Sequence, residues 1–164
     1  MYYRQLYESP LGPLSLVASE KGLRGIWFVG QQHAEKGISG SVFEQPHPIL
    51  DLTERALTAY FAGREVDWSP IPLDLQGTAF QLSVWRLLET IPYGQTTTYG
   101  QLAQRLGISS SQAVGGAVGR NPFLILIPCH RVVGQKGQLT GYAGGLDKKE
   151  WLLSHERARK EPTQ

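Results

Sequence analysis

The hydrophobic pattern of this chain changes at a proline-containing stretch, residues 68–77 (WSPIPLDLQG). Before this stretch, short segments rich in aromatic and β-branched residues alternate with turn sequences, which is typical of strands. After it, most apolar residues recur three or four positions apart, which is typical of helices. We therefore predict two domains, residues 1–75 built on a small sheet and residues 76–164 mostly helical, an α+β organisation.

The first thirty residues are predicted to form three strands separated by the turn sequences SPLGP and SEKG. The segments with the strand pattern are Tyr2–Tyr7, Leu14–Ala18 and Leu23–Val29. Because short connections join neighbouring strands as hairpins, we expect the sheet to be antiparallel. Residues 31–47 show no period and are expected to be a loop, after which helical spacing runs from Pro48 to just before Gly63.

Four helices are predicted in the second domain. The segments with helical spacing are residues 80–91, 99–106, 112–120 and 147–155. The first is expected to bury Phe80 and Val84 on one face, and Gly107 is expected to end the second. Asp147 and Glu150 have the spacing of a capping box for the last helix. The apolar residues 123–127 are expected to form a strand-like run.

The second and third of these helices have the dimensions of a helix-turn-helix, with Ser109–Ser111 offering N-cap residues for the third. The third helix contains Gly115, Gly116 and Gly119, and glycine destabilises a helix. Their clustering therefore indicates close approach of another backbone. A DNA backbone and a neighbouring helix both remain candidates.

Charge is nearly balanced overall, with 16 Lys and Arg residues against 14 Asp and Glu residues, but it is unevenly distributed. Residues 1–75 carry 6 basic and 9 acidic side chains, whereas residues 76–164 carry 10 and 5. A basic second half favours a nucleic-acid partner, although small differences of this kind are common. The N-terminal sequence lacks a signal-peptide pattern and no segment has the length of a membrane span, so we expect a cytoplasmic protein.

Cys129 is the single cysteine, which excludes an internal disulfide and a zinc site built from several cysteines. It is followed by His130, so a nucleophile–base pair is one interpretation and a buried structural cysteine beside a surface histidine is the other. A base needs a group that orients it. The downstream carboxylates Asp147, Glu150 and Glu156 are all candidates, and spacing does not choose among them.

A series of motifs covers nearly all of residues 80–156. Besides IPCHRVV (127–133), they are FQxxVW (80–85), IPxG (91–94), YGxLA (99–103), AVGGA (113–117), NP (121–122), TGYAGG (140–145) and KEWLLxHE (149–156). In this order they resemble the O6-alkylguanine-DNA alkyltransferases, also called methylated-DNA–protein-cysteine methyltransferases. Residues 1–75 match only loosely. The resemblance implies a ribonuclease H-like first domain and a winged-helix-like second domain.

The resemblance also implies a function, namely direct reversal of DNA alkylation damage. In this family a helix-turn-helix enters the minor groove and the alkylated guanine is flipped out of the stack. A cysteine thiolate then takes the alkyl group from O6 in one irreversible displacement, which consumes the protein. The implied partner is double-stranded DNA that contains alkylated guanine. We expect a monomer without a cofactor or metal, with cooperation between copies on DNA left open.

The resemblance assigns roles to individual positions. Cys129 would accept the alkyl group, His130 would activate it through a water, and Glu156 would orient His130. Asn121 would fix the turn before the active site, and Tyr99 would contact the lesion's 3′ phosphate and the flipped base. The positions expected to bind DNA are Gln81, Tyr99, Gly100, Gln112, Ala113, Gly115, Arg120, Gln135 and Lys136. Those expected to line the substrate pocket are Pro128, Val132, Tyr142 and Ala143.

One position departs from the family pattern. Members usually place an arginine immediately before the AVGG segment, where it fills the gap left by the flipped base, and this chain has Gln112. Glutamine provides neither the charge nor the planar stack of arginine. We expect weaker DNA binding or slower flipping, unless Arg105 or Arg120 reaches the gap.

Two alternatives to alkyl transfer use the same motifs. Some relatives bind lesions without repairing them, but they replace the acceptor cysteine, which this chain keeps as Cys129. A helix-turn-helix regulator without chemistry is the other alternative. His33 and His47 are isolated in the sequence and are interpreted as surface loop residues.

Overall fold

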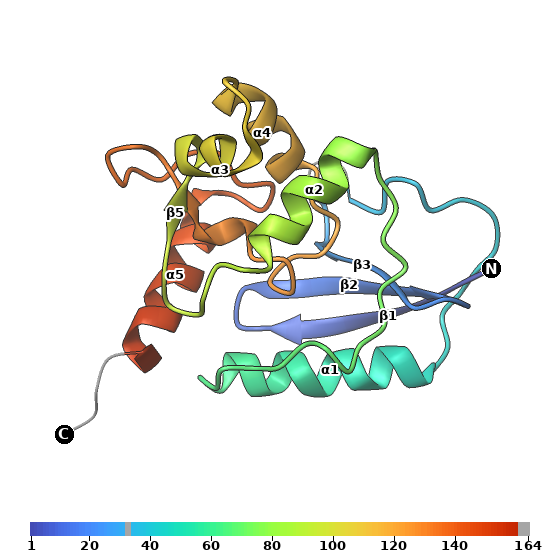
Figure 1. Cartoon of the computed structure of the whole chain (residues 1–164). Helices are drawn as coiled ribbons and strands as arrows, with labels where there is room; N and C mark the ends of the chain where they lie inside the picture. Colours follow the sequence, from blue (N-terminus) through green and yellow to red (C-terminus); the bar gives the residue numbers. More distant parts are fainter. Residues whose placement is uncertain (32–33, 161–164) are drawn as a thin grey trace. The chain divides into compact units, whose positions relative to one another are not determined.

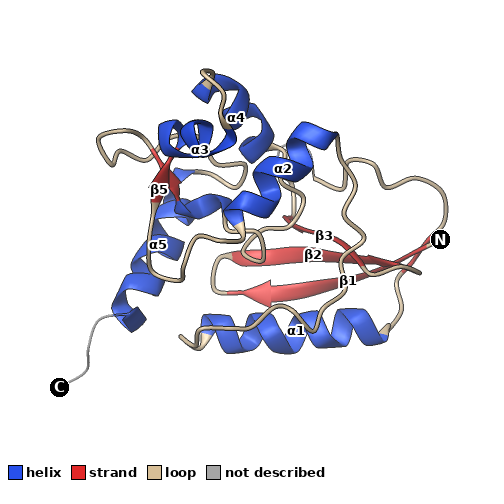
Figure 2. Cartoon of the chain, in the orientation of Figure 1, coloured by secondary structure: helices blue, strands red, loops and turns tan. Residues whose placement is uncertain are grey.

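The computed structural model describes residues 1–31 and 34–160, so His33 lies outside the described residues. The chain divides into two compact units, Met1–Leu75 and Gln76–Gln164, each with its own set of elements (Figures 1 and 2). No helix in the described part of the chain is long and apolar enough to cross a membrane.

The first unit is built on a four-stranded sheet of order β3-β2-β1-β4. Its strands are β1 (Tyr2–Ser9), β2 (Gly12–Ser19), β3 (Leu23–Phe28) and β4 (Val42–Phe43). The first three pair in antiparallel fashion, as predicted. The prediction of a loop over residues 31–47 is wrong at β4, which pairs in parallel with the start of β1. A strand of two residues is too short to show a period in the sequence.

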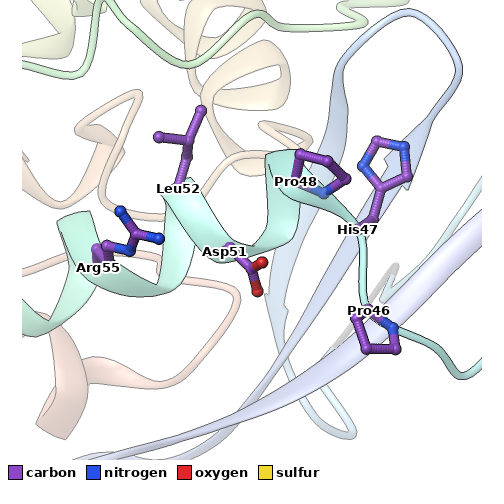
Figure 3. Close-up of a pocket in the computed structure, with 6 residues that line it drawn as sticks. All are labelled: Pro46, His47, Pro48, Asp51, Leu52 and Arg55. Atoms are coloured by element: carbon purple, nitrogen blue, oxygen red, sulfur yellow. The ribbon is translucent and has the colours of Figure 1, made fainter.

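Helix α1 (Pro48–Phe61) packs against β1 and β2 and buries Leu50, Leu57 and Tyr60. Burial of a leucine side chain contributes about 1.5–3 kcal/mol, so this face fixes the helix on the sheet. His47 is not an isolated loop residue, because its Nδ1 accepts a hydrogen bond from the Ile49 amide as the N-cap of α1. The pocket beside this helix start (Figure 3) is lined by Pro46, His47, Pro48, Asp51, Leu52 and Arg55.

The second unit is mostly helical. Its elements are α2 (Ala79–Leu88), β5 (Thr97–Thr98), α3 (Tyr99–Leu106), α4 (Ser111–Gly119), the 3-10 turn η1 (Cys129–Arg131), β6 (Val132–Val133) and α5 (Leu146–Lys160). The four predicted helices are present, and β5 and β6 form a short parallel pair. The α+β class, with a small N-terminal sheet and a mostly helical second part, is therefore confirmed.

The ends of α3 and α4 agree with the sequence signals for a helix-turn-helix. Gly107 ends α3 in the left-handed conformation, with φ of 72°, which only glycine adopts without strain. The Ser110 side chain then accepts a hydrogen bond from the Ala113 amide as the N-cap of α4. These two residues set the length of the turn and thereby the pairing of α3 with α4.

Three details of the second unit correct the sequence prediction. Residues 124–127 form a turn and a bend rather than a strand-like run, because Asn121 draws their backbone into a compact loop. Asp147 lies in the first turn of α5 instead of capping it, since the helix begins at Leu146. On α2, Phe80 remains 37% exposed, and Trp85 is buried instead with its indole N–H bonded to the Ala117 carbonyl.

Candidate active site

Cys129 begins the 3-10 turn η1 and is 6% exposed. Its backbone amide donates to the Ile127 carbonyl at 2.7 Å, which bends the chain sharply around Pro128. Such a bend agrees with the presence of Pro128, because proline disfavours regular secondary structure. Burial raises the pKa of the Cys129 thiol, while Asn121 and the positive charge of Lys149 act in the opposite direction.

Asn121 organises the turn that carries the cysteine. Its side-chain nitrogen donates to the carbonyls of Phe123, at 3.2 Å, and Ile127, at 2.6 Å, and its oxygen accepts from the Phe123 amide. The turn needs such bracing because Ile125 has φ of 72°, a conformation that costs a β-branched residue about 1–3 kcal/mol. Asn121 is itself buried, so these hydrogen bonds are shielded from water.

His130 lies against Glu156 on α5, with 2.6 Å between His130 Nε2 and Glu156 Oε2. Both side chains are almost fully buried. Of the three carboxylates that spacing left open, the structure therefore brings Glu156 to the histidine, whereas Asp147 and Glu150 are exposed. Glu156 also binds Arg131 through two hydrogen bonds, which the sequence analysis did not assign.

The protonation states of this cluster follow from burial and charge. Burial lowers the pKa of His130, and the positive charges of Arg131 and Lys149 add to this effect against the pull of Glu156. Burial acts to raise the pKa of Glu156, but the hydrogen bonds and charges of its partners outweigh this and hold that pKa well below its usual value. Glu156 is thus ionised and His130 neutral near pH 7. In the described part of the chain, His130 Nδ1 has no hydrogen-bond partner.

Lys149 is a second residue that the sequence analysis missed. It is fully buried on α5, and its ammonium donates to the carbonyls of Thr140, at 2.7 Å, and Gly141, at 3.3 Å. The Tyr99 hydroxyl donates to the same Thr140 carbonyl, and Lys149 Nζ lies 6.0 Å from the centre of the Tyr99 ring. Burial lowers the pKa of Lys149 to about 8. Lys149 therefore ties the loop before α5 to the start of α3.

The remaining predicted pocket residues lie at the two ends of η1 and on the loop before α5. Pro128 and Val132 are buried, and Tyr142 and Ala143 are half-buried on the loop before α5. The Tyr142 hydroxyl is enclosed, and burial raises the pKa of Tyr142 well above its usual value, so the group remains a neutral phenol. The candidate site thus combines one thiol, one neutral imidazole and a buried ion pair.

The residues expected to contact DNA are distributed over the surface of the second unit. The exposed ones are Gly100, Gln112, Ala113, Arg120, Gln135 and Lys136. Tyr99, Gly100 and Gln135 line a common pocket at the start of α3. Gln81 has a structural task, because its side chain accepts from the Thr78 amide in the capping box of α2.

The glycines of α4 are not explained by a neighbouring helix. A Cβ atom added at Gly116 or Gly119 would meet no described atom within 4 Å, and one added at Gly115 would lie 3.8 Å from the Tyr99 ring, an ordinary contact. Helices α2 and α3 pack against α4, but their approach does not require glycine at Gly115, Gly116 or Gly119. The bare backbone of α4 remains open to an external partner.

Both parts of the chain match one protein family. Residues 79–158 match the 6-O-methylguanine DNA methyltransferase, DNA binding domain, and residues 1–75 match the ribonuclease-like domain of the same proteins. The chain belongs to the 6-O-methylguanine DNA methyltransferase family. Curated relatives named methylated-DNA–protein-cysteine methyltransferase include one from Methanosarcina acetivorans, 46% identical over 95% of this chain and 98% of its own length. Another, from Mycolicibacterium paratuberculosis, is 45% identical over 92% of this chain and 89% of its own length.

Solved structures of family members have the same fold. Mycobacterium tuberculosis OGT in complex with DNA superimposes with a TM-score of 0.83 at 40% identity, over 96% of this chain and 94% of that chain. The O6-methylguanine-DNA methyltransferase from Pyrococcus kodakaraensis superimposes with a TM-score of 0.72 at 29% identity, over 95% and 99%. The family resemblance inferred from the motifs is thereby confirmed.

Proposed function

We propose that this protein repairs alkylated DNA by transferring the alkyl group from O6 of guanine to Cys129. The observation that carries the proposal is the buried hydrogen bond between His130 and an ionised Glu156, next in the chain to the buried Cys129, within a member of this family. A soft sulfur nucleophile suits displacement at an alkyl carbon, because thiolate is the strongest nucleophile among side chains near neutral pH. The reaction is methylated-DNA–protein-cysteine S-methyl transfer, and each molecule acts once.

The site geometry supports a proton path from Cys129 to His130. Because His130 Nε2 donates to the ionised Glu156, Nδ1 is the nitrogen with a free lone pair, and it takes the Cys129 proton through one water. The sulfur–carbon bond forms as the carbon–O6 bond breaks, and the electron pair of the broken bond goes to guanine. The proton lost by the thiol is matched by the proton that guanine takes up. The product is a thioether, which no further step reverses.

The substrate must leave the DNA stack to reach Cys129. A sulfur in a side chain that is 6% exposed cannot meet a base inside a duplex, so the damaged guanine is flipped out, at a cost of a few kcal/mol. The α3–α4 helix-turn-helix enters the minor groove, with the glycine-rich face of α4 allowing the DNA backbone to approach closely. The positive balance of residues 76–164 favours phosphate contacts.

The other predicted residues receive supporting roles in this proposal. Asn121 holds the turn that presents the thiol, and Tyr99 contacts the phosphate and the flipped base from the start of α3. Pro128, Val132, Tyr142 and Ala143 form the pocket around the base. The DNA contacts are those of Gln81, Tyr99, Gly100, Gln112, Ala113, Gly115, Arg120, Gln135 and Lys136. We propose that the protein acts as a cytoplasmic monomer, in a compartment that keeps its single thiol reduced.

Intact-mass spectrometry tests the proposal directly. After incubation with a duplex that contains one O6-methylguanine, the protein should be one methyl group heavier, and the same duplex with unmodified guanine should leave the mass unchanged. Cys129→Ala should retain DNA binding in a gel-retardation assay but show no mass increase. A protein that retards the methylated duplex while keeping its mass would instead be a lesion binder, the second family activity considered above.

A further inference from the structure

The guanidinium of Arg131 is held by several contacts from different parts of the second unit. Its Nε and Nη2 donate to the two oxygens of Glu156, at 2.8 and 3.0 Å, and its Nη1 donates to the Ile91 carbonyl at 2.8 Å. The guanidinium carbon also lies 5.7 Å from the centre of the Tyr93 ring. With the side chain 8% exposed, these contacts hold the guanidinium on both oxygens of the carboxylate.

The carboxylate of Glu156 is surrounded by donors as a result. Its oxygens accept from Arg131, from His130 and from the Gly94 amide, at 3.2 Å. An arginine is always protonated, so a carboxylate bound to it in this way stays ionised and can only accept hydrogen bonds. His130 Nε2 must therefore carry a hydrogen. The ionised Glu156 thus favours the His130 tautomer with its hydrogen on Nε2, and Arg131 contributes to this through Glu156.

Charged and titratable groups surround the pair of His130 and Glu156. Glu156 and Lys149 on α5 and Arg131 on η1 act on His130 itself. Tyr142, on the loop before α5, interacts with Cys129 and Glu156, and Tyr93, on the loop after α2, contacts Arg131. Glu156 is the anion of this group and favours a protonated imidazole, whereas Arg131 and Lys149 oppose it. Arg131 is bound directly to the anion, so it weakens the attraction between Glu156 and an imidazolium.

We propose that Arg131 is a positioning residue that keeps His130 neutral, with Nδ1 free to accept a proton, by binding both oxygens of Glu156. Without Arg131, His130 would be more basic and would be protonated at a higher pH. Its Nδ1 would then be blocked in mildly acidic solution, while in alkaline solution a more basic imidazole would remove the thiol proton at least as well. This inference rests on the proposed function for its kinetic consequence only.

The kinetic test is the pH dependence of single-turnover methyl transfer in Arg131→Met. We expect the acid limb of the rate profile to move up by about one pH unit, which corresponds to an about tenfold lower rate at pH values below the limb. The rate on the alkaline plateau should be equal to or above that of the unchanged protein. Arg64→Met, which removes an exposed arginine from the first unit, is the control for the change in net charge and should leave the profile in place.

A direct titration makes the test independent of alkyl transfer. The ring carbon resonances of His130, followed by NMR as a function of pH without DNA, should give a higher pKa in Arg131→Met than in the unchanged protein. Failure of the proposed function would show as no mass increase in the unchanged protein. The NMR titration would still decide the role of Arg131 in that case.

A conservative variant covers the case in which Arg131→Met does not fold. Arg131→Lys keeps the charge but cannot bind both carboxylate oxygens and the Ile91 carbonyl together, so its acid limb and its His130 pKa should move in the same direction by a smaller amount. A variant whose rate falls by one factor at all pH values, with an unchanged His130 titration, would overturn the proposal and leave Arg131 a structural residue.

Discussion

The two units of this protein use charged side chains in different ways. In the first unit, Arg4 forms ion pairs with Glu35 and Glu44, and all three side chains are between 27% and 60% exposed. In the second unit, the pairs that Glu156 makes with His130 and Arg131 are no more than 8% exposed. Exposed pairs contribute at most about 1 kcal/mol, whereas burial of a charge costs several kcal/mol before pairing compensates it. A small gain in stability is enough to explain the exposed pairs of Arg4. The buried pairs of Glu156 contribute little net stability, so we attribute them to function.

Because the ion pairs of the second unit are buried, we expect removal of Glu156 to cause the largest loss of stability. Glu156→Ala would leave the guanidinium of Arg131 buried without its anion, so we expect a loss of about 3–5 kcal/mol in the free energy of unfolding. Glu44→Ala in the first unit should cost less than about 1 kcal/mol. Urea denaturation of the two variants measures both values, and similar losses would remove the contrast between the units.

Asn121→Ala should have an intermediate effect. It removes three hydrogen bonds from a buried turn and leaves their backbone partners unsatisfied, with an expected cost of about 1–3 kcal/mol. His47→Ala, which removes a single cap bond from the start of α1, should cost about 1 kcal/mol or less. The same denaturation assay compares them. An Asn121 variant as stable as the His47 variant would show that the turn keeps its shape without the asparagine.

A smaller, graded effect is expected from pH. The pKa of His130 is lowered on folding, so its neutral form adds stability that is present above about pH 6.5 and is lost as the pH falls below that value. The pKa of Glu156 is also lowered, and its contribution is lost as the pH falls below about 4.3. Melting temperatures should decline in these two ranges. In Glu156→Gln the lower step should shrink, and an unchanged lower step would assign it to other carboxylates.

Gln112→Arg should barely change stability, because Gln112 is exposed at the start of α4. Its expected effect is on function, since an arginine can fill the gap left by a flipped base with charge and a planar stack. Single-turnover methyl transfer from duplex DNA should become faster. Transfer from free O6-methylguanine, where no flipping occurs, is the control and should be unaffected. An unchanged rate on duplex DNA contradicts the prediction.

Local signals in the sequence predicted most of the fold. Helical spacing, Gly107 and Ser110 located α3 and α4, because caps and apolar stripes depend on neighbouring residues only. The strand-like interpretation of residues 123–127 failed because the Asn121 side chain, which is polar and nearby, competes for their backbone groups. The apolar composition of residues 123–127 gives no sign that a side chain outside the segment will bind their backbone groups.

The site was predictable in part. Cys129, His130 and Glu156 were named from the family motifs, whereas Arg131 and Lys149 were not. Both contact groups far away in the sequence, namely the Ile91 carbonyl for Arg131 and the Tyr99 ring for Lys149. One signal was present: Lys149 and Glu156 are seven residues apart and share the buried face of α5 with Leu152 and Leu153. Charges on an apolar helical stripe indicate a buried polar site.

The burial of Cys129 also determines how long the protein lasts before it is used. A thiol with a raised pKa holds little thiolate near neutral pH, and with 6% exposure it is out of reach of most dissolved oxidants and alkylating agents. A protein that reacts once has no second cysteine and no regenerating step to restore it. The closed turn around Cys129 therefore protects the thiol from side reactions until a flipped base enters the site.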